Sequence, residues 1–119
     1  MNTPILTPAT RVGIARTSVG IALLALQTVE DIVNGPLTPQ ELAEILREFH
    51  CEADPQAGVF GQVAQLLTAA GDVAERLAPD GDGEASCPLH EAAGFITDSA
   101  GERIYQATRA LDPQGERTR

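Results

Sequence analysis

The chain has 119 residues, of which 17 are acidic and 8 are basic, so its formal net charge is −9. This balance argues against sequence-independent nucleic-acid binding, which needs cations to neutralise phosphates, and against binding to an anionic membrane surface. A content of 43% hydrophobic and 21% charged residues is that of a globular protein, and the length fits one domain. The basic residues are all Arg, a composition typical of GC-rich genomes such as those of actinobacteria and their phages.

The first predicted helix covers residues 8–33, with Thr7 as its cap and Pro8 in its first turn. Its apolar residues recur every three or four positions, and Ile21 and Leu23 widen this stripe. A helix that is apolar around most of its girth is expected to be buried on most sides. The uncharged stretch Thr17–Val29 is shorter than the roughly 20 residues of a spanning helix, so we expect no membrane span. The stripe residues are Val12, Ala15, Val19, Ala22, Leu26, Val29 and Val33.

The second predicted helix is short and has the clearest start signal in the chain. Thr38 is placed to cap it, Pro39 to occupy its first turn, and Glu41 to complete a capping box. The helix then continues to Phe49.

Two long helices follow, over residues 54–77 and 86–111. Asp54-Pro55 predicts the start of the first, and Asp112-Pro113 predicts the end of the second. The segment between them, residues 79–83, is rich in Pro, Gly and Asp and predicts a loop. Helical periodicity in the third helix is given by Val59, Phe60, Val63, Leu66, Leu67, Ala70, Val73, Ala74 and Leu77.

These elements predict an all-α fold, a compact bundle of about four helices, three long and one short, mostly antiparallel. We expect a single domain over residues 1–119, with flexible ends at 1–7 and 112–119. With only 3% aromatic residues, the core must be aliphatic and built from small side chains. Among the glycines inside predicted helices, Gly94 and Gly101 are the best placed for close helix packing.

Four residues could form a zinc site if the helix ends that carry them meet. His50-Cys51 closes the second helix, and Cys87 and His90 open the fourth with an acceptable ligand spacing. The adjacent His-Cys pair is less usual, because neighbouring side chains on a helix diverge. The alternatives are buried thiols, a Cys51–Cys87 disulfide, or no contact at all.

The loop after the third helix resembles a calcium-binding EF-hand loop over twelve residues. Carboxylates at Asp80, Asp82, Glu84 and Glu91 occupy positions 1, 3, 5 and 12 of that pattern. The loop departs from the pattern at Ala85, where the EF-hand has a glycine. The alternative is a solvated acidic loop without a bound ion.

Catalysis and DNA reading find little support in the sequence. The chain has no Gly-rich phosphate loop, no nucleophile elbow and no H-E-x-x-H motif. The helix after Thr38 resembles the opening of a helix-turn-helix, but the next helix has no basic residue before Arg76. We therefore expect neither an enzyme nor a direct nucleic-acid binder.

The sequence favours a non-enzymatic, cytoplasmic helical protein that acts through protein–protein contacts and associates with itself, as an assembly, adaptor or accessory subunit. The excess of apolar surface on the first helix motivates this hypothesis. Two alternatives remain, a metal-dependent regulator that uses zinc or calcium, and an acidic inhibitor that mimics nucleic acid. In the favoured case we expect no cofactor and no membrane partner.

Overall fold

The computed structural model describes residues 8–115, and all regular structure in that range is helical. The helical segments are α1 (Pro8–Val33), α2 (Pro39–Phe49), α3 (Gly58–Leu77), α4 (Ser86–Gly94), η1 (Phe95–Ala100) and α5 (Gly101–Leu111). The predicted all-α class, with three long helices and one short one, is therefore confirmed. The chain divides into two compact units, one ending at Leu37 that contains α1, and one that begins at Thr38.

The first unit is essentially one helix. α1 begins at Pro8 and ends at Val33, as its sequence signals predict, whereas its predicted cap, Thr7, lies outside the described residues. No residue of α1 is buried. The expectation that this helix is buried on most sides is therefore not met within this unit.

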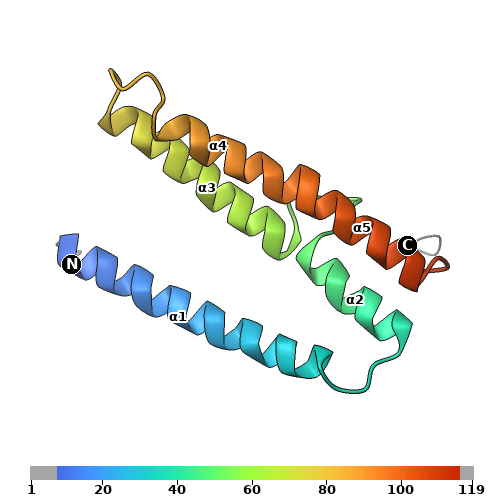
Figure 1. Cartoon of the computed structure of the whole chain (residues 1–119). Helices are drawn as coiled ribbons and strands as arrows, with labels where there is room; N and C mark the ends of the chain where they lie inside the picture. Colours follow the sequence, from blue (N-terminus) through green and yellow to red (C-terminus); the bar gives the residue numbers. More distant parts are fainter. Residues whose placement is uncertain (1–7, 116–119) are drawn as a thin grey trace, which may run out of the picture. The chain divides into compact units, whose positions relative to one another are not determined.

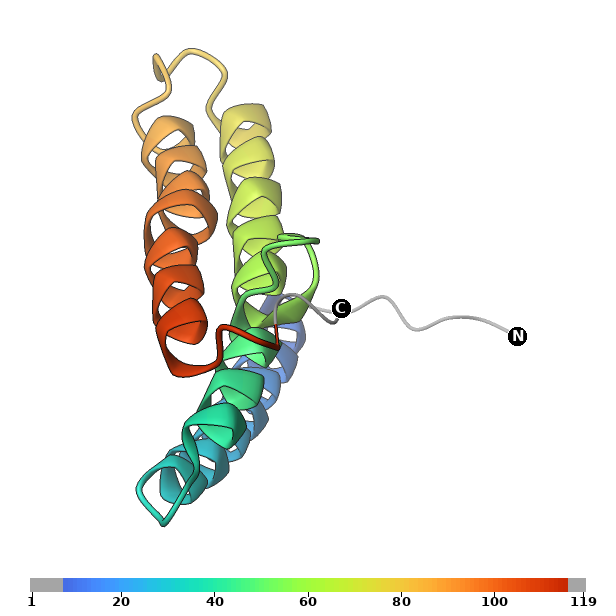
Figure 2. The same cartoon turned by 90° about the vertical axis from the view of Figure 1, so that its right-hand side faces the viewer.

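The second unit is built around one long helix that consists of α4, η1 and α5 in direct succession. α3 packs against α4, and α2 packs against α5, so α2 and α3 follow one another along the long helix (Figures 1 and 2). η1 is a π-helical turn between α4 and α5. Such turns insert an extra residue into a helix and locally widen it.

The start of α2 follows the predicted capping box. The Thr38 hydroxyl accepts a hydrogen bond from the Glu41 amide at 3.1 Å, and the Glu41 carboxylate accepts one from the Thr38 amide at 2.9 Å. These two reciprocal bonds satisfy amides that the first turn leaves free. The hydrogen bonds from the Thr38 backbone and side chain lower the pKa of the exposed Glu41 carboxyl below its ordinary value.

The start of α3 differs from the predicted one. α3 begins at Gly58, because residues 54–57 form a turn in which Asp54 accepts hydrogen bonds from the amides of Gln56 and Ala57. Asp54 thus closes a turn where the sequence predicts a cap. Gly58 has φ +86°, and a Cβ there would lie 2.8 Å from the Glu48 carbonyl oxygen. The entry to α3 is therefore specific for glycine.

The core is made of small residues, as the low aromatic content predicts. Its buried hydrophobic residues are Ala43, Ala64 and Ala93. Buried polar residues accompany them, and the guanidinium of Arg47 on α2 forms an ion pair with Asp112 at the end of α5. Asp112, which the sequence assigns to a flexible tail, is thus held in place, and its carboxylate also accepts a hydrogen bond from the Gly115 amide.

Candidate functional site

The apolar surface of α1 is the first candidate site, because large side chains point outward on all its sides. Ile21 and Leu24 are 64% and 65% exposed. The outward-facing large residues of α1 are Val12, Ile14, Val19, Ile21, Leu23, Leu24, Leu26, Ile32 and Val33. Monomeric soluble proteins rarely expose so much contiguous apolar surface, and such a surface marks a contact with something else.

A second apolar surface lies on α3, on the side that does not pack against α4. The packed side carries Gly61, Ala64 and Gly71, all buried. The other side carries what we call the α3 stripe, of which Leu66 is 63% exposed and Leu77 is 80% exposed. The α3 stripe consists of Val63, Leu66, Ala70, Val73 and Leu77, spaced alternately by three and four residues. This is the spacing of one apolar seam along a helix.

The length of α1 bears on what could cover it. With 26 residues, α1 is long and apolar enough to cross a membrane by length and composition alone. The sequence expectation considered only the uncharged run after Arg16, but a cation near the end of such a helix can extend to the membrane interface. A buried core helix of a soluble protein and a signal sequence near the N-terminus pass the same test.

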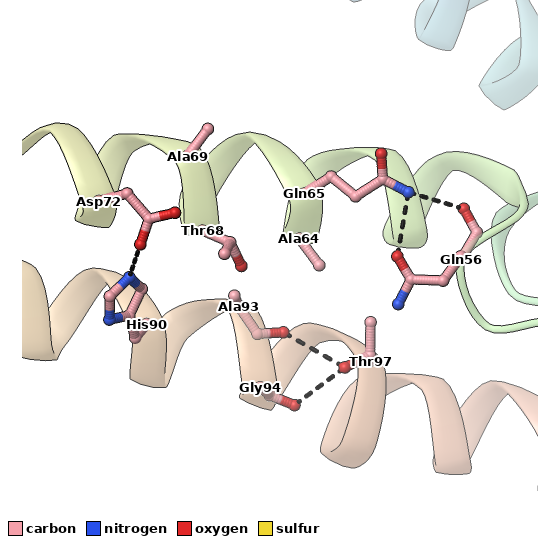
Figure 3. Close-up of a pocket in the computed structure, with 10 residues that line it drawn as sticks. All are labelled: Gln56, Ala64, Gln65, Thr68, Ala69, Asp72, His90, Ala93, Gly94 and Thr97. Carbon is pink, nitrogen blue, oxygen red and sulfur yellow. Dashed lines mark hydrogen bonds and ion pairs between the residues drawn. The ribbon is translucent and has the colours of Figure 1, made fainter.

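A hollow of about 560 Å³ lies along the contact of α3 with α4 and η1 (Figure 3). Small residues on both helices create it, among them Ala64, Ala93 and Gly94. At one end, the Gln65 side-chain amide donates hydrogen bonds to the backbone and side-chain oxygens of Gln56, at 3.4 and 3.0 Å. The hollow is a broad, open groove with polar groups at its two ends.

His90 lies at the other end of this groove. Its Nε2 is 3.1 Å from the Asp72 carboxylate across the α3–α4 contact (Figure 3). The ring lies over Gly71, where a Cβ would lie only 2.5 Å from it. Since both side chains of the pair are 44% or more exposed, water screens their interaction. The pair therefore fastens α4 to α3 loosely.

His50 makes a tighter version of the same contact at the α2–α5 packing. It is 4% exposed, and its ring lies over Gly101, where a Cβ would lie 2.6 Å from it. Its Nε2 is 2.9 Å from the Glu52 carboxylate. Gly101 therefore makes the close approach that the sequence predicts for it, whereas Gly94 does not, because a Cβ there would meet only Asp98 of the same helix at 3.9 Å.

The four candidate zinc ligands are not brought together. His50 and Cys51 follow α2 and lie near Gly101, whereas Cys87 and His90 lie on α4 opposite α3. Along the long helix, Cys87 and Gly101 are separated by about 21 Å. Both cysteines are free thiols, so the disulfide alternative is not realised either.

The four candidate calcium ligands lie on the acidic loop and on α4. Asp80, Asp82 and Glu84 occupy a series of tight turns, in which the Glu84 amide bonds to the Gly81 carbonyl oxygen, and Glu91 lies on α4. Within residues 8–115, no three His, Cys, Asp or Glu side chains are grouped so that they could hold a metal ion. Neither the zinc set nor the calcium set is therefore assembled as a site.

Comparisons with known proteins do not assign the chain to a family. No family model matches the chain, and no curated protein or solved structure matches it.

Proposed function

We propose that this chain is a non-enzymatic assembly or accessory protein that acts through protein–protein contacts and associates with its own copies through α1. The observation that carries the proposal is that α1, although apolar on all sides, has no buried residue in the single chain. Removing such a surface from water is worth about 25 cal/mol per Å², so covering it is strongly favourable.

The small core of the second unit supports the same proposal. Its buried hydrophobic residues are three alanines, while larger apolar side chains such as Leu66, Leu77 and Phe95 remain exposed. A unit of this size with so little buried apolar volume has a narrow stability margin. Association that buries further apolar surface would add to the free energy of unfolding.

Sedimentation equilibrium of the full chain, over a range of micromolar concentrations, tests the proposal. We expect a dimer or a larger assembly for the natural sequence. Leu26→Glu places a charge on the apolar surface of α1 and is expected to weaken association by at least about 30-fold. Gln27→Glu adds the same charge at an exposed polar position of α1 and is the matched control.

Three outcomes would contradict the proposal. The first is a monomer at every concentration, and the second is association that Leu26→Glu does not weaken. The third is that α1 inserts into a lipid membrane, which is tested by flotation with phosphatidylcholine vesicles. A chain that enters the vesicles through α1 and does not associate in solution has a membrane helix and not a protein-contact helix.

A further inference from the structure

We propose that the surface that receives α1 is the α3 stripe of a second copy, with the two helices antiparallel. This inference rests on the proposed self-association and deepens it, because it names both contacting surfaces. Each is exposed in the single chain, and each is apolar. Two copies that exchange their α1 helices would cover both α3 stripes and the facing side of each α1 in one closed, two-fold symmetric dimer.

The two helices have matching apolar spacing. The stripe of α1 and the α3 stripe both alternate steps of three and four residues, which is the spacing of helices that pack side by side with interlocking side chains. Reversing one helix against the other preserves this match. In the antiparallel register that we propose, Leu26 lies opposite Leu66, Ala22 opposite Ala70, and Val19 opposite Val73.

The charges favour the antiparallel direction at the end where α1 begins. The first part of α1 carries Arg11 and Arg16 and no acid before Glu30. In the proposed register it extends past the end of α3 towards the acidic loop. That end of α3 and its loop carry five acids and one cation, namely Asp72, Glu75, Asp80, Asp82, Glu84 and Arg76. Arg16 lies level with Arg76 in this register, but acids outnumber cations at this end, and the C-terminus of α3 adds its own partial negative charge.

The other end of α1 gives the same result. Glu30 and Asp31 would lie beside the first turn of α3, where the backbone amides carry partial positive charge. The first turn of α3 contains no acid, the loop before it carries only Glu52 and Asp54, and its cap residue, Ala57, makes no side-chain cap bond. In the parallel direction Glu30 and Asp31 would instead face the acidic end of α3. Charge complementarity therefore distinguishes the two directions.

The connection between α1 and α2 favours a second copy as the source of α1. The segment from Asn34 to Thr38 can extend over roughly 17 Å at most. α2 is itself about 16 Å long, and it separates this connection from α3 along the chain. If α1 packed on the α3 of its own chain in the proposed register, Val33 would lie level with Val59. The connection would then have to be almost fully extended. A second copy has no such restriction.

Disulfide trapping between differently marked chains tests the inference. Cys51→Ser and Cys87→Ala first remove the native thiols. One chain then carries Leu26→Cys, and a second, distinguishable by a mass tag, carries Leu66→Cys. After mixing and mild oxidation we expect a mixed disulfide between the two chains, formed at least about tenfold faster than with a Leu77→Cys partner, which lies at the other end of the stripe.

A charge variant of α3 provides the second arm. Leu66→Glu is expected to raise the dimer dissociation constant by at least about 30-fold. Gln62→Glu adds the same charge at an exposed polar position on α3 and is expected to change it less than threefold. Because Leu66 is exposed in the second unit, its replacement should leave that unit folded, which its circular dichroism verifies.

The outcomes separate the two proposals. A chain that is monomeric in sedimentation overturns both. A chain that associates, is weakened by Leu26→Glu, but neither forms the mixed disulfide nor responds to Leu66→Glu overturns only the assignment to α3. A Leu26→Cys, Leu66→Cys double variant that closes its disulfide within a single monomeric chain shows that α1 covers its own α3, and this also overturns the inference.

Discussion

Arg47 and Asp112, at the end of α5, form an ion pair that fastens α2 to the end of the long helix. The guanidinium Nη1 is 3.1 Å from the carboxylate, and Nη2 is 3.4 Å from the Asp112 carbonyl oxygen. The two side chains are only 8% and 12% exposed. Charges held this far from water are costly to leave without a partner.

Arg47→Ala should therefore destabilise the second unit more than any exposed substitution. Removing one partner of a buried ion pair costs about 3–5 kcal/mol. Urea unfolding followed by circular dichroism measures this loss. Arg109→Ala is the control, because Arg109 is exposed and stacks only on Tyr105, and its loss should cost at most about 1 kcal/mol. Equal losses for the two variants would show that the Arg47–Asp112 pair does not hold the unit together.

Gly101→Ala and Gly94→Ala should change stability in opposite directions. A methyl group at Gly101 would lie 2.6 Å from the buried His50 ring, so Gly101→Ala should cost about 1–3 kcal/mol. At Gly94 the methyl group meets only Asp98, at 3.9 Å, and the helix propensity of alanine should add about 0.5–1 kcal/mol. Thermal melting of the two variants measures both signs. Stabilisation by Gly101→Ala would contradict the close α2–α5 approach.

The capping box of α2 predicts a local pH dependence. Because the hydrogen bonds from Thr38 lower the pKa of Glu41, its charge stabilises the folded state above its ordinary pKa of 4.5. This contribution is lost as the pH falls through the lower pKa of the folded state. The natural chain should therefore melt higher than Glu41→Gln at pH 6, and the difference should vanish as the pH is lowered below 4.5.

An NMR titration of the Glu41 side chain isolates the cause. In the natural chain its pKa should lie below 4.5, and in Thr38→Ala, which loses the hydroxyl but keeps the backbone amide, it should rise only part of the way towards that value. Thr38→Ala should also cost about 1 kcal/mol of stability, as the loss of a helix cap does. A Glu41 pKa at or above 4.5 in the natural chain would contradict the reciprocal bonding.

The helix starts show which features could be predicted from sequence and why. Pro8, and Thr38 with Pro39 and Glu41, act through contacts within one helical turn, and the sequence locates them correctly. The start of α3 was predicted at Asp54-Pro55, but Asp54 bonds to the amides after it and forms a turn. The side-chain oxygen of an Asp can either cap a helix or close a turn, and the packing of the rest of the chain decides which one forms.

The candidate site was harder to predict. Helical periodicity correctly placed Leu66 and Leu67 in one helix, but it did not separate the side that packs on α4 from the side that remains exposed. This helix has more apolar residues than one packed face needs. That excess was the sequence signal for a second, exposed apolar side. Of the two Cys-His pairs only Cys87 and His90 have a typical ligand spacing, and the pairs do not share a location, because His50 and His90 lie over glycines of two different helices.

Hydrogen–deuterium exchange at several protein concentrations tests the central claim, that a second copy covers α1, most directly. The account predicts that the amides of α1 and of α3 exchange more slowly as the concentration rises through the association range, while those of the 79–83 loop do not change. Leu26→Glu should abolish the concentration dependence of α1. Exchange from α1 that is equally fast at every concentration in the natural chain would contradict the account.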